Sequence, residues 1–158
     1  MIVEICLVNL GNTGQFKYYD VATMEDLKNA YDDMATVFNA DEIEIQGMSH
    51  GDAVVQNLGE LMEMCESNDA ELEDAINILQ ATGCIYTTKS IIENGSYCYY
   101  EGDDKESAFI DYLDDIGYFE NIPSHIINYL NYNMIMQDME IEGLVIEWID
   151  YNKYLFIY

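Results

Sequence analysis

The chain of 158 residues contains 31 acidic residues against five lysines and no arginine, which gives a formal net charge of −26. Half of the residues are hydrophobic, so the composition predicts a folded chain rather than a disordered one. The charge excludes nucleic acid and anionic membranes as partners, because both would repel the protein, and it favours a strongly basic surface or a cation.

The start of the chain has the pattern of a small β-β-α-β module. Ile2–Leu10 predicts a strand, and Phe16–Val21 predicts its hairpin partner after a glycine-containing turn. Thr23, with Asp26 three residues later, predicts the capped start of a helix. Alternation of apolar and polar residues predicts a third strand at Asp41–Met48.

The middle of the chain is predicted to be helical. A linker is expected at Ser49–Val55, followed by two helices with no strand between them. Asn68, with Glu71 three residues later, is the predicted N-cap of the second helix, and Gly83 is its predicted end. The stretch Thr87–Glu93 is ambiguous and is expected to add at most another turn of helix.

A strand, a helix and a hairpin are expected in the last third of the chain. Ser96–Glu101 predicts a tyrosine-rich strand, and Asp103 is the predicted cap of a helix that runs to Ile116. Glu142–Asp150 and Tyr154–Tyr158 predict an antiparallel hairpin.

These elements predict an α+β fold made of three small modules. Residues 1–54 form the N-terminal α+β module, with the order β-β-α-β. Residues 55–95 form a small helical module, and residues 96–158 form a mixed α/β C-terminal module with the antiparallel hairpin.

The excess of acids is far larger than solubility requires, since a net charge of about 2–8 suffices for a small domain. The 26 uncompensated charges equal the phosphates of roughly 13 base pairs of duplex. Acids three or four residues apart on a helix lie about 5–6 Å apart, and alternate strand residues about 6.6 Å. For any one pair a solvated surface is the simpler explanation, whereas the whole set favours imitation of DNA phosphates. The candidate DNA-mimicking acids are Glu25, Asp26, Asp32, Asp33, Glu42, Glu44, Glu60, Glu63, Glu66, Glu71, Asp74, Asp103, Asp104, Asp111, Asp114 and Asp115.

A second informative stretch is Leu113–Met139. Gly117 is expected at a positive φ that ends a helix, and Pro123, the single proline, is expected at the first position of the next helix. The stretch combines Gly-x-Phe-x-x-Ile-Pro with Ile-x-x-Tyr-Leu-x-Tyr and a final Gln-Asp-Met. The residues that carry this pattern are Gly117, Phe119, Ile122, Pro123, Ile126, Tyr129, Leu130, Tyr132 and Asp138.

This pattern resembles the antirestriction segment of the ArdA family, DNA-mimicking inhibitors carried by plasmids, conjugative transposons and phages. The family usually has Gly-Arg-Asp near the end of the segment, where this chain has Met136-Gln137-Asp138, so the glycine and the arginine are both absent. Val8–Gly11 and the aromatic strand Tyr154–Tyr158 resemble the family's two ends.

The resemblance implies a fold and a function. Family members place three small modules in line, so an elongated chain is expected, and they dimerise through the third module, where segment 117–138 would supply dimer contacts. They evade host defence by binding the methyltransferase–specificity core of type I restriction–modification enzymes. The resemblance therefore implies a non-catalytic homodimer whose carboxylates block the DNA-binding groove of such an enzyme.

Other functions have less support in the sequence. No phosphate loop, dinucleotide fingerprint, nucleophile elbow or His-Glu-x-x-His occurs, so we expect no enzyme and no cofactor, although dense carboxylates always offer candidate pairs for a glycosidase. The histidines share no ligand spacing with the cysteines, and the acids do not follow an EF-hand, so no metal site is expected. The alternatives are a mimic aimed at a CRISPR effector or a nucleoid protein, and an acidic cation-binding or scaffold module.

The amino terminus predicts the compartment. Met1–Leu10 lacks the basic region of a signal peptide and carries Glu4 inside its apolar run. The chain also has no run of eighteen apolar residues that would span a membrane. A cytoplasmic protein is therefore expected.

Overall fold

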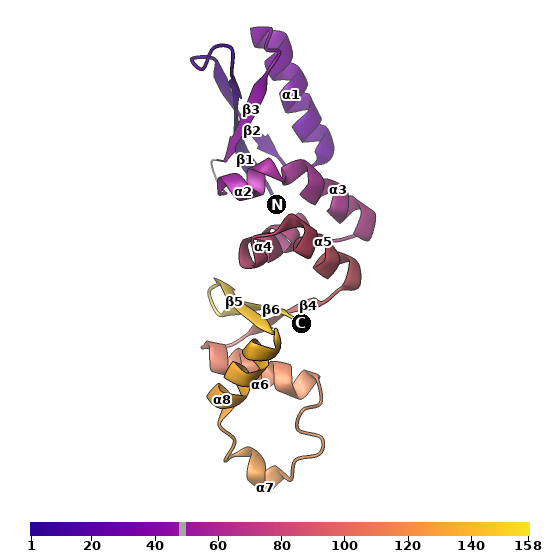
Figure 1. Ribbon diagram of the computed structural model, residues 1–158, viewed down its shortest axis with the longest axis vertical. Coiled ribbons are helices and arrows are strands. Elements are labelled where there is room, and N and C mark those ends of the chain that lie inside the picture. The colour runs from indigo at the N-terminus through magenta and orange to yellow at the C-terminus, as the bar shows by residue number, and fades with distance from the viewer. Residues whose placement is uncertain (48–49) are drawn as a thin grey trace. The chain divides into compact units, whose positions relative to one another are not determined.

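The computed structural model describes residues 1–47 and 50–158 and has a mixed α+β fold (Figure 1). An N-terminal three-stranded antiparallel sheet with a helix is followed by a helical middle and by a C-terminal sheet that contains the hairpin of β5 (Val145–Asp150) and β6 (Lys153–Ile157). The predicted fold class, α+β, is confirmed. Contacts divide the chain into two compact units, Met1–Glu93 and Asn94–Tyr158. The finer division into three modules stays a prediction.

The first unit is built on a sheet with the strand order β2-β1-β3, in which β1 pairs antiparallel with both neighbours. Met48, the last residue of the predicted third strand, lies outside the described residues, and the strand itself is present as β3. The elements up to the unit boundary are β1 (Val3–Asn9), β2 (Phe16–Val21), α1 (Met24–Phe38), β3 (Ile43–Gly47), α2 (Asp52–Gln56), α3 (Leu58–Asn68), α4 (Leu72–Thr82) and α5 (Ile85–Asn94).

One face of this sheet forms the core of the N-terminal unit. The β1 side chains Val3, Ile5 and Leu7 are fully buried, and α1 lies along this face (Figure 1). The helix contributes Leu27 and Met34, which lie two turns apart on one side of α1. The core therefore combines the side chains of β1 that face α1 with the buried side of α1, and Cys6 and Val8 on the other face of this central strand are buried as well.

Thr23 and Asp26 form the predicted cap of α1. Thr23 Oγ1 accepts a hydrogen bond from Asp26 N at 3.1 Å, and Asp26 Oδ2 accepts one from Thr23 N at 3.0 Å. The side-chain bond with Thr23, followed by the bond from the Ala22 N–H, lowers the pKa of Asp26 below its ordinary value. The ionised form of Asp26 therefore stabilises the folded helix.

This cap gives a prediction for pH dependence. Because the pKa of Asp26 is lower in the folded chain than in the unfolded chain, its contribution is complete above the unfolded value of about 3.9 and is lost as the pH falls through the folded value. Asp26→Asn is expected to unfold at a lower temperature than wild type at pH 7, and at nearly the same temperature at about pH 2. Thermal unfolding of both proteins at both pH values gives the difference between their unfolding temperatures at each pH. Effects of pH on the other charged groups are the same in both proteins and cancel in this difference. An equal difference at both pH values would contradict this role of Asp26.

The predicted linker Ser49–Val55 is wrong over its described second half. Asp52–Gln56 forms α2, in which Val54 and Val55 are each 2% exposed. Two adjacent valines that pack into the unit cannot belong to a flexible connection. Ser49 lies outside the described residues.

The predicted cap of the second helix is also wrong. Asn68 is the last residue of α3, and its Nδ2 donates a hydrogen bond to the carbonyl of Met64 at 2.9 Å. Asp69 takes the left-handed conformation (φ 53°) that ends α3, and α4 begins after Glu71. Gly83 ends α4 at φ 66°, as expected. The ambiguous stretch at Thr87–Glu93 lies in a helix of 10 residues, α5.

The second unit has a sheet with the strand order β4-β6-β5, antiparallel throughout. Its core packs Phe109, Tyr112 and Leu113 against Ile146 and Phe156. The Tyr112 and Phe156 rings are stacked at 5.0 Å between centroids. The elements of this unit are β4 (Tyr97–Glu101), α6 (Lys105–Asp115), α7 (Ser124–Ile127), α8 (Tyr132–Glu142), β5 (Val145–Asp150) and β6 (Lys153–Ile157).

Several boundaries in the second unit differ from the predicted ones. Asp104, not Asp103, caps α6, because its Oδ1 accepts a hydrogen bond from Ser107 N at 2.8 Å. Pro123 is the N-cap of the short α7, one position before the one expected. The predicted hairpin began at Glu142, which instead ends α8. Gly117 has the predicted positive φ of 72°.

Candidate partner-binding surface

The acids of this protein all lie at its surface. No aspartate or glutamate is buried in the parts of the chain that the structure describes. Among the candidate acids, Asp26, Asp33 and Asp74 are half-buried and the others are exposed. Every candidate acid can therefore face a partner without rearrangement of the core.

The helices position many of these acids in rows. On α3, Glu60, Glu63 and Glu66 follow one another at intervals of three residues, while Leu61 and Met62 face the core. Residues at this spacing are neighbours on a helix surface. The row is a direct consequence of an apolar stripe that leaves the rest of α3 to solvent. It gives α3 a surface of closely spaced negative charges.

The α6 helix repeats this arrangement in the second unit. Phe109 and Leu113 are fully buried, while Asp111, Asp114 and Asp115 are exposed. Asp115 Oδ2 accepts a hydrogen bond from the Tyr100 hydroxyl of β4 at 2.9 Å. The predicted separation of the charged and apolar sides of this helix is therefore present.

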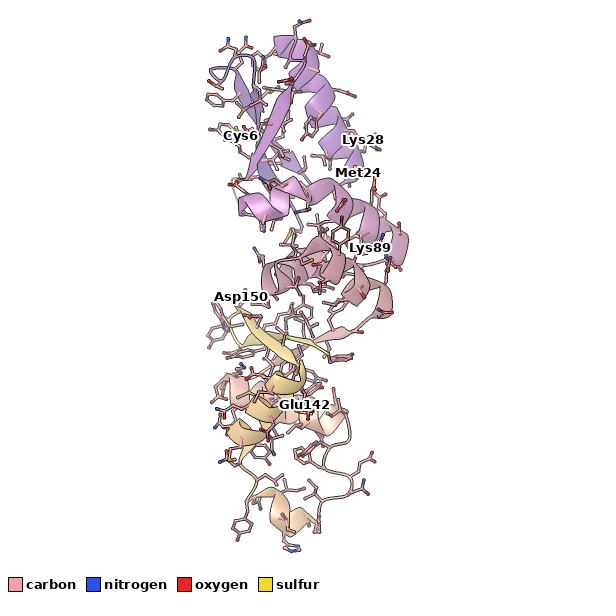
Figure 2. The ribbon with its side chains drawn as sticks, in the orientation of Figure 1. Cys6, Met24, Lys28, Lys89, Glu142 and Asp150 are labelled. Atoms are coloured by element: carbon pink, nitrogen blue, oxygen red, sulfur yellow. The ribbon has the colours of Figure 1, made fainter. Side chains whose placement is uncertain are left out.

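The lysines neutralise few of these charges. Three of them form ion pairs: Lys17 with Asp33 at 2.7 Å, Lys89 with Glu93 at 3.9 Å and Lys105 with Glu140 at 2.6 Å. Lys153 lies over the Tyr99 ring, 4.2 Å from its centroid, and Lys28 lies on the exposed side of α1 (Figure 2). The five lysines are divided between the units, three in Met1–Glu93 and two in Asn94–Tyr158, so the acids outnumber the lysines in both units.

The local partners of two candidate acids favour their charged forms. Hydrogen bonds from the side chains of Lys17, first, and Tyr19 lower the pKa of Asp33. Hydrogen bonds from the side chain and backbone of Ser107 lower the pKa of Asp104. Both carboxylates therefore keep their charge to lower pH than ordinary aspartates.

Segment 117–138 divides into inward and outward side chains. Phe119 and Tyr132 pack against the core with their rings edge to face, 6.3 Å between centroids. Ile126 is 41% exposed and Tyr129 is 86% exposed. The remaining residues of the pattern are intermediate or exposed: Ile122 and Leu130 are half-buried, and Pro123 and Asp138 are exposed. The segment thus combines packing inside the unit with apolar groups left to solvent.

A groove of about 350 Å³ lies between α3 and α5. Glu60 and Glu63 line it from α3, and Tyr86 and Glu93 line it from α5. Lys89, which lies on α5 (Figure 2), is in the same groove and forms the ion pair with Glu93. The groove therefore already contains its own cation.

The sequence did not single out Glu4 and Asp20, which the structure places directly opposite each other on neighbouring strands. The sequence does contain part of this information, because alternation in β2 places Asp20 on the same face as Phe16 and Tyr18. The register of β1 against β2 decides which residues of the two strands are opposite each other, and that register depends on the turn between them.

No group of three or more histidine, cysteine, aspartate or glutamate side chains that could hold a metal ion is found among residues 1–47 and 50–158. Within these ranges no helix combines the length and the apolar character needed to cross a membrane. Cys6, Cys65, Cys84 and Cys98 are free thiols. No known protein family matches the chain, and no curated protein matches it either.

Proposed function

We propose that this protein is a non-catalytic, DNA-mimicking inhibitor of the ArdA type, which blocks the DNA-binding groove of a type I restriction–modification enzyme in the cytoplasm. One observation supports this most: none of the acids is buried in the described residues, and both units carry them on helices whose apolar stripes face inward. Selection for a stable fold alone does not require such an excess of charge.

The proposed mechanism is electrostatic. DNA-binding enzymes hold phosphates through lysine, arginine and backbone N–H groups, and these contacts carry no sequence information. Carboxylates in rows about 5–6 Å apart can accept the same hydrogen bonds and ion pairs. The field of the whole protein would also accelerate encounter with a basic groove. Because base edges are not imitated, inhibition is expected to be independent of the enzyme's recognition sequence.

The direct test is displacement of DNA. The protein is expected to release a labelled duplex from a type I methyltransferase–specificity complex in a gel-shift titration at low salt. Its own affinity for the enzyme is expected to fall as salt rises, because both surfaces are screened. Polyglutamate of the same total charge serves as the control, since it carries the charge without the fold. Displacement no better than that of polyglutamate, or no displacement at all, would overturn the proposal.

The same proposal includes a homodimer. Exposed apolar side chains in the second unit support it, among them Tyr129 (86% exposed), Met134 (61%) and Ile141 (84%). Light scattering at micromolar concentration is expected to give twice the 18.2 kDa mass of one chain. Tyr129→Ser combined with Ile141→Ser is expected to shift the mass toward one chain, because aromatic and aliphatic anchors dominate interface cores. A single-chain mass for the wild type would contradict the dimer.

A further inference from the structure

The N-terminal sheet has a second face, which α1 does not cover. Alternation along β1 and β2 places Glu4, Cys6 and Val8, with Phe16, Tyr18 and Asp20, on this open face, on the other side of the sheet from Val3, Ile5 and Leu7. Cys6 and Val8 of the central strand are themselves buried, whereas Glu4, Phe16, Tyr18 and Asp20 are exposed. Glu44 and Gln46 join them from β3, because they pair with Val8 and Cys6. Figure 2 shows Cys6 on this sheet.

Tyr18 occupies a central position on the open face. It is 58% exposed, and its ring meets that of Phe16 edge to face at 5.7 Å between centroids. Tyr18 also lines two shallow hollows: one of about 290 Å³ with Glu4 and Asp20, and one of about 300 Å³ that includes Glu44. An exposed aromatic ring is thus bordered by carboxylates on two sides.

The open face carries no lysine among its described residues. Lys17 of β2 belongs to the opposite face, where it pairs with Asp33 of α1. The α3–α5 groove differs in this respect, because Lys89 already lies beside its carboxylates. An exposed tyrosine lies beside acids both on the open face and in the α3–α5 groove. Only on the open face would the cation have to come from a partner.

We propose that the open face of the β2-β1-β3 sheet binds an arginine side chain of a basic protein partner, with the guanidinium against the Tyr18 ring and its N–H groups directed to Asp20, which lines the same hollow. Glu44, which lies on the other side of the ring, adds to the negative potential of the face. This inference rests on the proposed function for the identity of the partner. A planar guanidinium can stack on an aromatic ring and donate to carboxylates in its plane at the same time, whereas a lysine ammonium is a point charge that does only one of these well. Nucleic-acid bases also stack on aromatic rings of sheets, but Asp20 and Glu44 would repel their phosphates.

The inference is tested with tetra-arginine and tetra-lysine peptides, which have the same charge. Each peptide is titrated into the full-length protein, and its affinity is read from NMR shifts of the backbone amides of β1 and β2. Tetra-arginine is expected to bind there about two- to fivefold more tightly than tetra-lysine, the range that one exposed cation–π contact supplies. Tyr18→Thr is expected to remove this preference, because threonine suits a strand but has no ring. Tyr86→Ala, which removes an exposed ring from the α3–α5 groove, is expected to leave it unchanged.

Equal affinity for the two peptides at these amides, or a preference that survives Tyr18→Thr, would overturn the inference. If Tyr18→Thr does not fold, Asp20→Asn with Glu44→Gln replaces it, and both peptides are then expected to bind at least twofold more weakly at β1 and β2. No weakening in that double variant would equally overturn the inference. DNA displacement by the wild type without an arginine preference at the sheet would reject this site alone, whereas an arginine preference without DNA displacement would reject the proposed function alone.

Discussion

Phe109→Ala is expected to destabilise the C-terminal unit by about 3–5 kcal/mol, the usual cost of deleting a fully buried aromatic ring. Phe109 has no exposed surface, and it packs in the cluster that joins α6 to the sheet through Tyr112 and Phe156. A small unit has a total stability near the low end of about 5–15 kcal/mol. The substitution therefore removes a large fraction of the stability of Asn94–Tyr158.

Urea unfolding of the full chain, followed by near-ultraviolet circular dichroism, measures this loss. The tyrosine signal reports the C-terminal unit well, because Tyr112 stacks within its core at 6.1 Å from Phe109 and 5.0 Å from Phe156. Tyr151→Ala is the matched control, since it deletes an aromatic ring that is 84% exposed, and it is expected to change stability by only about 0.5 kcal/mol. Similar losses in the two variants would show that the core assignment is wrong.

The second large effect is expected from removing charge. A variant with Glu60, Glu63 and Glu66 changed to glutamine, and Asp111, Asp114 and Asp115 changed to asparagine, is expected to displace DNA at least about fivefold less well. The estimate takes each exposed ion pair with the enzyme as about 0.2–1 kcal/mol, so that six together amount to roughly 1–6 kcal/mol. Any one of these substitutions alone is expected to weaken displacement by at most about fivefold.

The control keeps the charge and changes the side chains. Glutamate-to-aspartate and aspartate-to-glutamate exchanges at the same positions are expected to displace DNA nearly as well as wild type. Thermal unfolding should show that the neutral variant is folded, because all six side chains are exposed and like charges three or four residues apart on a helix repel each other. If the neutral variant displaced DNA as well as wild type, the carboxylates would not be the active groups.

The elements of the fold that depend on local chemistry were predictable from the sequence. The Thr23–Asp26 cap and the positive φ of Gly117 were both expected, and both are observed. Each depends on residues within a few positions of one another, so the preference is visible in a short window of sequence. The exposed side of α6 was predictable for a similar reason, because apolar periodicity assigns Phe109 and Leu113 to the core.

Competing signals explain the errors. Asn68 and Asp69 are both good candidates for a helix end, and the prediction used Asn68 to start α4, whereas Asp69 ends α3 in the left-handed conformation. Asp103 and Asp104 are equally suitable caps by type, and the position of Ser107 decides between them. The open face of the N-terminal sheet was not predictable, because alternation separates two faces without showing which one a helix will cover.

Because every acid lies at the surface, the acidic positions of such a protein can change during evolution without disturbing the core. Under the proposed function no single carboxylate is indispensable, so an acid lost from one exposed position can be replaced by an acid gained at a neighbouring one. The buried residues, such as Phe109, Leu113 and Phe156, do not have this freedom, because packing fixes their size and shape. Relatives of this chain are therefore expected to share the pattern of core residues and the overall negative charge while their surface sequences diverge.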